Sequence, residues 1–279
     1  MYICIDGRIV PAATPVFLPD NKGYRYGDGL FETIKTVNGR MPLWDLHMER
    51  LLAGIALLEL PWPGSFSVEK LQSDILSLCR RNNCHDLGRV RLSVSRGEGG
   101  LHETGRDTLH YLIECSPAAD PSGKLNQNGL VAGIFPYAEK STDKFSGLKS
   151  ANYLPYTMAA RFARQQKWDD CLVLNTNGNI ADSTIANIFL VKNDLILTPD
   201  AAQGAVDGVM RKYLLEKLRN KGYALQETAV SVEAVKDADE LFLTNAVNGI
   251  RWVGSLGNKT FTNLVSAAIH REFIQTLWA

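Results

Sequence analysis

The feature that most constrains this chain is a break in its pattern near the middle. Residues 118–128 are rich in Ala, Pro, Asp, Ser, Gly and Asn, which is typical of a linker, and strand and helix patterns occur on both sides of it. The sequence therefore predicts a mixed α+β (α/β) fold in two domains. The smaller N-terminal domain is expected over residues 1–117 and the larger C-terminal domain over residues 129–279.

Turn residues and periodicity predict the elements of each half. Asp6-Gly7 and Asn38-Gly39 indicate hairpin turns, and Asp45 is expected to cap a helix that runs to Leu58. The other predicted helices cover 68–81, 152–167, 209–220 and 263–277. Strands are predicted at 2–5, 8–10, 30–37, 89–96, 109–116, 130–137, 171–175, 188–191, 195–198, 223–229, 240–244 and 250–253.

Composition excludes several classes of function. Lys+Arg and Asp+Glu number 30 each, whereas a nucleic-acid-binding protein usually carries a basic excess. The first residues lack the pattern of a signal peptide, and no apolar run approaches the ~20 residues of a membrane span. The five cysteines include no C-x-x-C pair, so we expect reduced, mostly buried thiols in the cytoplasm. We therefore expect no nucleic-acid partner, no membrane and no metal.

Two motifs in the second half carry candidate chemistry. Lys149, within Gly147–Leu154, lies before an apolar helix, although a single lysine is usually a solvated charge. The segment Asn177–Phe189 indicates a hairpin turn followed by a strand, in which Asp182 and Asn187 would satisfy backbone groups. Each motif alone is explained by local structure.

Two further motifs place groups that could bind an anion on or at the start of a predicted helix. His47 and Arg50 follow the segment Tyr26–Thr33 and share a helix face, where a surface ion pair with Glu49 or Glu32 is the structural alternative. The segment Val206–Arg211 places a glycine at a helix start, where free N–H groups and the positive dipole end favour phosphate.

Together and in this order, the four motifs resemble the class IV aminotransferases, the fold-type IV enzymes that use pyridoxal 5′-phosphate. The family includes branched-chain aminotransferases, D-amino-acid aminotransferases and 4-amino-4-deoxychorismate lyases. The resemblance runs from Tyr2 to Val253. It implies a two-domain fold like that of the D-amino-acid aminotransferases, with the Schiff-base lysine in the larger domain, and a homodimer.

The resemblance also implies roles for particular residues. Lys149 is similar to the Schiff-base lysine that moves the substrate's α-proton, and Asp182 to the carboxylate that pairs with the pyridine nitrogen, where most members have Glu. Arg50 resembles the arginine that clamps the phosphate. The other implied cofactor-binding residues are Tyr153, Asn187, Gly208, Val209, Met210 and Ala246. The implied substrate-binding residues are Tyr26, Phe31, Arg91 and Val247.

Smaller features favour the lyases within this family. The segments Ser95–Gly100, Gly208–Arg211 and Thr244–Ala246 are similar to those of deoxychorismate lyases, whereas aminotransferases commonly have Thr in place of Ala246. Leu101 stands where many lyases have an arginine for a substrate carboxylate. Arg91 is then the candidate for that task, because Arg89, Arg91 and Ser93 share one strand face that must meet solvent or a polar pocket.

We therefore expect 4-amino-4-deoxychorismate lyase activity, which eliminates pyruvate and gives 4-aminobenzoate for folate synthesis. The alternative is an aminotransferase that moves the amino group of branched-chain or D-amino acids to 2-oxoglutarate. A third possibility is a cofactor-binding protein without catalysis. In both catalytic cases the partner is a small amino substrate with a carboxylate.

Overall fold

The computed structural model describes residues 1–62, 66–103, 108–118 and 123–278. Its chain divides into two compact units, of which the first comprises Met1–Pro121 with Lys149–Asn152 and the second Ser122–Leu148 with Tyr153–Ala279. The division falls inside the predicted linker, although residues 119–122 of that linker lie outside the described residues.

The position of Lys149 differs from the sequence-based domain assignment. The sequence places this lysine in the larger domain, but residues 149–152 cluster with the first unit. The reason is backbone pairing: the Phe31 N–H donates to the Lys149 carbonyl and the Ala151 N–H donates to the Gly29 carbonyl, both at 2.9 Å. The lysine segment therefore lies along the edge of the sheet of the first unit.

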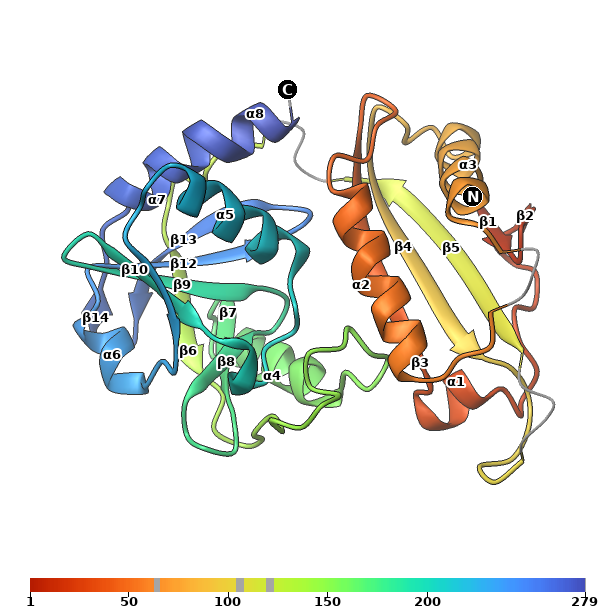
Figure 1. The fold of residues 1–279 in the computed structure, drawn as a ribbon, viewed down its shortest axis with the longest axis horizontal. Coiled ribbons are helices and arrows are strands. Elements are labelled where there is room, and N and C mark those ends of the chain that lie inside the picture. Colours follow the sequence, from red (N-terminus) through yellow and green to blue (C-terminus); the bar gives the residue numbers. More distant parts are fainter. Residues whose placement is uncertain (63–65, 104–107, 119–122, 279) are drawn as a thin grey trace. The chain divides into compact units, whose positions relative to one another are not determined.

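The first unit is built on an antiparallel sheet. Its strands follow the order β2-β1-β5-β4-β3. The strands are β1 (Tyr2–Ile5), β2 (Arg8–Pro11), β3 (Gly29–Val37), β4 (Leu87–Arg96) and β5 (Leu109–Pro117). The helices are α1 (Lys22–Tyr26), α2 (Trp44–Leu57) and α3 (Val68–Arg81), and Figure 1 shows α2 running along β3.

The two faces of this sheet differ in character. Leu92 and Ile113 face the side covered by α2 and α3 and are fully buried, as strand alternation requires. Phe31 and Ser93 lie opposite each other in register on the other face, together with Arg91. The predicted polar face of β4 is thus confirmed.

The ends of the helices in the first unit agree with some of the predicted caps and differ from others. The helix predicted over 68–81 is confirmed, and the Ser67 hydroxyl caps it by accepting from the Lys70 N–H. The predicted Asp45 cap is wrong, because α2 begins one residue earlier and Asp45 lies inside its first turn, where a carboxylate suits the helix dipole. Helix α1 was not predicted; Asn21 caps it and Gly27 ends it with φ +66°.

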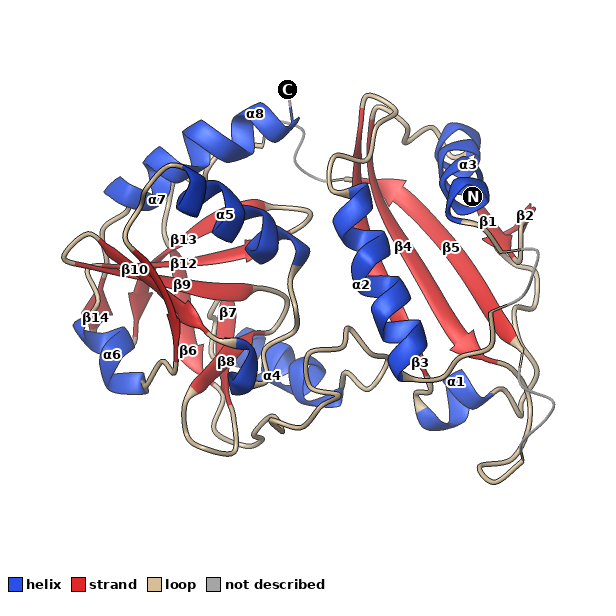
Figure 2. Cartoon of the chain, viewed as in Figure 1, coloured by secondary structure: helices blue, strands red, loops and turns tan. Residues whose placement is uncertain are grey.

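The second unit is built on a nine-stranded mixed sheet with helices around it (Figure 2). The strand order is β11-β10-β9-β12-β13-β6-β7-β8, and β14 pairs with β13. The strands are β6 (Leu130–Ile134), β7 (Asp170–Leu174), β8 (Ile180–Ser183), β9 (Asn187–Lys192), β10 (Leu195–Pro199), β11 (Leu225–Thr228), β12 (Glu240–Asn245), β13 (Gly249–Leu256) and β14 (Lys259–Thr260). The helices are α4 (Leu154–Gln165), η1 (Ala201–Gln203), α5 (Val209–Asn220), α6 (Val232–Asp237), α7 (Leu264–Ile269), η2 (His270–Ile274) and α8 (Gln275–Trp278).

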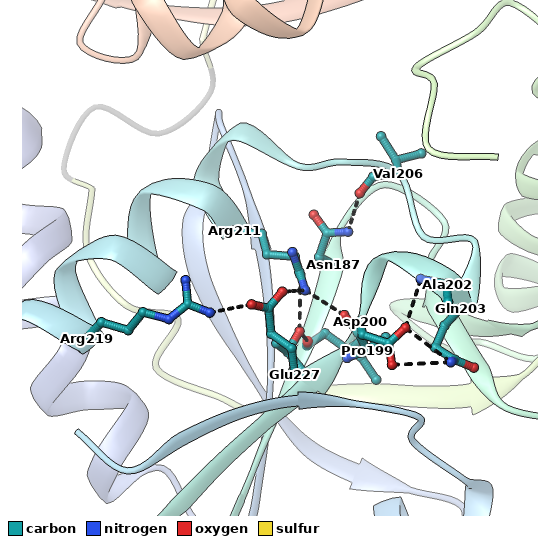
Figure 3. Close-up of polar contacts among 11 residues, drawn as sticks. Asn187, Pro199, Asp200, Ala202, Gln203, Val206, Arg211, Arg219 and Glu227 are labelled. Atoms are coloured by element: carbon teal, nitrogen blue, oxygen red, sulfur yellow. Dashed lines mark hydrogen bonds and ion pairs between the residues drawn. The ribbon is translucent and has the colours of Figure 1, made fainter. Parts of the chain in front are cut away.

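The core of the second unit lies in the middle of this sheet. Phe189 of β9 and Phe242 of β12 are opposite each other in register and stack with ring centroids 5.1 Å apart. Helix α5 covers β12 and is anchored by Arg211, which donates to the Pro199 carbonyl and to Glu227, each at 2.6 Å (Figure 3). Across the described residues, the helices are too short or too polar to cross a membrane.

Candidate active site

Lys149 and Arg91 meet at the same aromatic ring in the first unit. The Lys149 Nζ lies 4.5 Å from the centroid of Phe31, and the Arg91 guanidinium carbon lies 3.9 Å from it. Register explains the grouping, because Phe31 pairs with Ser93, whose hydroxyl accepts from Arg91 Nε at 3.2 Å. Cations are attracted to an aromatic face, so Phe31 orients an amine and a guanidinium together. The structure thus brings together three of the predicted site residues.

Arg50 belongs to a buried ionic cluster beneath α2. Its Nε donates to Glu32 Oε1 at 2.8 Å, its Nη2 donates to Oε2, and His47 Nδ1 lies 2.7 Å from Oε2. The side chain of Glu32 is 1% exposed. Of the two predicted partners of the His47–Arg50 face, Glu32 is in contact with both residues, and this ion pair is buried rather than at the surface.

Protonation in this cluster is set by opposing effects. Burial alone would raise the pKa of Glu32, but the charge of Arg50 and the hydrogen bond with His47 lower it to about 2. Burial lowers the pKa of His47, and the positive charges of Arg50 and Lys149 lower it further against the attraction of Glu32. The cluster therefore holds a charged carboxylate and arginine beside a neutral imidazole at neutral pH.

In the second unit, Asp182 is a buried carboxylate that accepts hydrogen bonds from a tyrosine hydroxyl and a backbone N–H. The Tyr156 hydroxyl donates to its two oxygens at 2.9 and 3.1 Å, and the Val206 N–H donates to Oδ2 at 2.8 Å. Burial, followed by the charge of Asp182, raises the pKa of Tyr156 well above its ordinary value. Asp182 is 2% exposed.

Sequence reasoning missed two neighbours of Asp182. Tyr156 carried one usable signal, since it lies three residues after Tyr153, the N-cap of α4, and the two tilted rings have centroids 4.5 Å apart. Lys140 Nζ lies 3.9 Å from Asp182 Oδ2 and is buried, with no hydrogen-bond partner among the described residues. Burial lowers the pKa of Lys140, against the attraction of Asp182.

Asp182 and Asn187 hold the backbone of one residue, Val206, from both sides. Asp182 accepts from the Val206 N–H at 2.8 Å. Asn187 Nδ2 donates to the Val206 carbonyl at 2.7 Å (Figure 3). The interpretation that both residues satisfy backbone groups is confirmed. These contacts hold the segment that leads into α5.

The start of α5 has the features of an anion-binding helix end. Gly208 is the N-cap and provides no side-chain acceptor, so no side chain at the cap occupies the first N–H groups, which include those of Val209 and Met210. A side chain at Gly208 is excluded, because its Cβ would lie 1.7 Å from Asn187 Oδ1. The glycine is required by this close approach.

The remaining predicted residues lie on turns and loops. Asn245 Oδ1 accepts from the Val247 N–H at 3.0 Å and from the Asn248 N–H at 2.8 Å, which shapes the turn that carries Ala246. The Tyr153 hydroxyl donates to the Thr184 carbonyl at 3.0 Å. In the first unit, Tyr26 is 40% exposed at the end of α1.

The two units have the mixed α/β architecture of the fold-type IV pyridoxal-phosphate enzymes, as a comparison with a solved structure shows. The structure of 4-amino-4-deoxychorismate lyase from Pseudomonas aeruginosa is similar with a TM-score of 0.81 and 26% identity. That similarity covers 99% of this chain and 97% of that chain. The expectation for the fold is confirmed.

The chain belongs to the family described as amino-transferase class IV, whose model matches residues 29–256. Aminodeoxychorismate lyase of Vibrio harveyi is 27% identical over 239 residues, covering 85% of this chain and 86% of that protein. A putative branched-chain-amino-acid aminotransferase of Methanocaldococcus jannaschii is 27% identical over 285 residues, covering 100% of this chain and 98% of that protein. The family consists of pyridoxal-phosphate-dependent enzymes, which confirms the expected enzyme class and cofactor.

The described residues fit this cofactor by their donor set. The first unit offers the primary amine of Lys149, and the second offers a buried carboxylate at Asp182 and an uncapped helix start at Gly208. Thr244 Oγ1, directly before the Asn245 turn, is a buried hydroxyl with no hydrogen-bond partner among the described residues. The aldehyde, the pyridine nitrogen and the phosphate of pyridoxal phosphate are thus each matched by a side chain or backbone group of suitable chemistry.

Proposed function

We propose that this chain is a 4-amino-4-deoxychorismate lyase, which releases pyruvate from its substrate and leaves 4-aminobenzoate. The observation that carries the proposal is the placement of Lys149 and Arg91 at one ring, Phe31. It sets a group that moves protons beside a group suited to a substrate carboxylate. The lyase-like segment Ser95–Gly100, Ala246 in place of threonine, and the similarity to lyases from two organisms support the lyase over an aminotransferase.

Lys149 and Asp182 are the residues to which we assign the chemistry. Pyridoxal phosphate, when bound, supplies an electron sink for the bond that breaks at the substrate's amino-bearing carbon. The Lys149 amine would hold the cofactor through its aldehyde group and would take the proton from the substrate's amino-bearing carbon. Asp182 would hold the proton on the pyridine nitrogen, because a carboxylate beside that nitrogen favours its protonated form.

Anion binding is assigned to a helix start of the second unit. The N–H groups of Val209 and Met210 would hold the cofactor phosphate, and Arg50 of the first unit stays a predicted phosphate ligand from the family resemblance. Arg50 is held for that task by its two contacts with Glu32. Tyr153, Asn187, Gly208 and Ala246 complete the proposed cofactor set, and Tyr26 and Val247 join Phe31 and Arg91 in the proposed substrate set. The homodimer and the cytoplasmic location stay predictions.

The decisive experiment follows pyruvate release from 4-amino-4-deoxychorismate by a coupled assay. The proposal expects stoichiometric pyruvate and 4-aminobenzoate, and loss of both in Lys149→Ala together with the visible absorption of the lysine-bound cofactor. Amino transfer from D-alanine or leucine to 2-oxoglutarate without pyruvate release would establish the aminotransferase alternative. Cofactor binding without turnover of any of these substrates would establish a non-catalytic protein.

The role of Arg91 is tested by a pair of matched variants. Arg91→Met removes the guanidinium beside Phe31, whereas Arg89→Met removes an exposed arginine two residues away on the same face. We expect Arg91→Met to raise KM at least roughly tenfold, the size of one or more lost charged hydrogen bonds, with a smaller change in kcat. Arg89→Met should leave both constants within about twofold. Equal effects of the two variants would remove Arg91 from the substrate site.

A further inference from the structure

Three cysteines of the first unit form a cluster that the proposed function does not use. Cys79 lies near the end of α3, Cys84 in the turn that follows, and Cys115 on β5. Their sulfur atoms all lie within 4.8 Å of one another, and all three residues are buried. Cys79 and Cys84 form a C-x4-C segment, and Cys115 lies more than thirty residues further along the chain. The three sulfurs are therefore brought together by the fold and not by the local sequence.

The backbone around Cys84 is held from several sides. Its N–H donates to the Cys79 carbonyl at 2.9 Å, and its carbonyl accepts from the Thr36 hydroxyl at 3.3 Å. A side chain at Gly88 would lie 2.5 Å from that carbonyl, so the turn packs closely against β4. The residues on both sides of Cys84, Asn83 and His85, are exposed, which places the buried thiol one residue from solvent.

The sulfur of Cys115 has a polar neighbour as well as two sulfur neighbours. Asn82 Nδ2 donates to it at 3.3 Å, and the sulfurs of Cys79 and Cys84 lie within 4.8 Å of it. A hydrogen-bond donor stabilises the negative charge of a metal-bound thiolate. The cluster therefore supplies three sulfur ligands and one donor in a buried site.

We propose that Cys79, Cys84 and Cys115 form a binding site for a single monovalent copper ion, coordinated by three sulfur atoms. Thiolate sulfur is a soft ligand and selects soft ions such as Cu(I). Structural zinc sites almost always take four ligands, and no His, Asp or Glu atom among the described residues completes this cluster as a fourth. Sulfurs already within 4.8 Å need only a small further approach to reach one ion.

The binding step balances without electron transfer. Cu(I) would replace the thiol protons of Cys79, Cys84 and Cys115, which leave to solvent, so three sulfur–copper bonds form and three S–H bonds break. The copper stays monovalent and the sulfurs are not oxidised. The site lies on the helix-covered side of the sheet, the side opposite Phe31, and it is independent of the proposed lyase chemistry.

The test titrates the reduced full-length protein with Cu(I) without oxygen, against a chelator that buffers free Cu(I). We expect one copper per chain and an X-ray absorption spectrum with sulfur neighbours only, three per copper. Cys84→Ala and Cys115→Ala should lose more than the roughly 10–100-fold in affinity that loss of an outer-shell partner costs. Cys4→Ala and Cys171→Ala remove buried cysteines outside the cluster and should bind like the parent protein.

Two measurements keep the result interpretable if a variant unfolds. Circular dichroism of each variant reports folding, and the absorption spectrum of the parent protein identifies the ligands without any substitution. The proposal would be overturned if the folded cluster variants kept their copper or if the spectrum showed a nitrogen or oxygen neighbour. It would also be overturned if the parent protein bound no copper at any chelator concentration tested. Binding of zinc in place of copper, at one ion per chain, would overturn it as well.

Discussion

Each unit buries one carboxylate near its proposed share of the active site, but the two are held in different ways. Glu32 contacts an arginine through two hydrogen bonds and a histidine through one. Asp182 accepts from a tyrosine hydroxyl and a backbone N–H, while Lys140 lies 3.9 Å away and makes no hydrogen bond to it. An arginine hydrogen-bonds to the first carboxylate, whereas Lys140 approaches the second only as an ion pair at 3.9 Å.

This difference separates a structural charge from one suited to a ligand. Arg50 matches the charge of Glu32, so the pair stabilises the packing of α2 on β3 and directs the arginine. Asp182 accepts from neutral donors and lies 3.9 Å from the Lys140 amine, so a cationic group brought by a ligand would meet a buried carboxylate. We expect substitutions in the first cluster to affect stability most, and substitutions of Asp182 to affect activity most.

The largest expected effect on stability comes from Glu32→Gln. The change leaves Arg50 in a mostly buried position without its charged partner, and removal of one member of a buried pair costs about 3–5 kcal/mol. Urea unfolding of the cofactor-free protein measures the loss. Glu49→Gln, an exposed carboxylate on the same helix, should change the free energy of unfolding by no more than about 0.5 kcal/mol. If both variants lost similar free energy of unfolding, the buried pair of Glu32 and Arg50 would contribute no more to stability than a surface carboxylate.

The next effect is on activity, in Asp182→Asn. The asparagine keeps an oxygen for Tyr156 and Val206 but loses the charge proposed to hold the pyridine proton, so we expect kcat to fall about 10²–10³-fold, as for loss of one preorganised electrostatic group. The matched control is Asp170→Asn, because Asp170 is also a buried carboxylate of this unit and is bonded by Thr184 and Cys171. Asp170→Asn should reduce stability and leave the absorption spectrum of the bound cofactor unchanged. If Asp182→Asn left the cofactor spectrum and kcat unchanged, Asp182 would have no role toward the cofactor and would not differ from Glu32 in this respect.

Acid should reveal the charge of Glu32 through its pKa. The pKa of Glu32 is lowered from 4.5 to about 2 on folding, so its stabilisation is complete above pH 4.5 and is lost as the pH falls toward 2. The neighbouring His47 also titrates, and its lowered pKa makes the folded state lose stability below pH 6.5. We therefore compare His47→Gln with His47→Gln/Glu32→Gln, where the difference in unfolding free energy should be constant above pH 4.5 and shrink below it. A difference independent of pH across this range would contradict the assignment.

The fold and the family motifs could be predicted from the sequence because both depend on short-range patterns of residues. Turn pairs such as Asp6-Gly7 adopt the positive φ they predict, and the alternation of β4 placed Arg91 on the polar face. The neighbours of Asp182 were missed because they are distant in sequence: Tyr156 is 26 residues away. Periodicity also could not show that residues 149–151 pair with β3, since edge pairing depends on which strand is left unpartnered.

The smallest effect, and the sharpest test of the comparison, is expected for Lys140→Met. The Lys140 amine is buried, has no hydrogen bond within the described part of the chain and lies at the outer limit of an ion pair. The attraction to Asp182 is therefore offset by the cost of burying the charge. Methionine is of similar length and removes both contributions, so the free energy of unfolding should stay within about 1 kcal/mol of the parent value. Arg50→Met, its counterpart in the first unit, should cost about 3 kcal/mol or more because Glu32 then loses its cation. If the two variants lose equal stability, Asp182 is held by an ion pair as Glu32 is, and its charge is not reserved for a ligand.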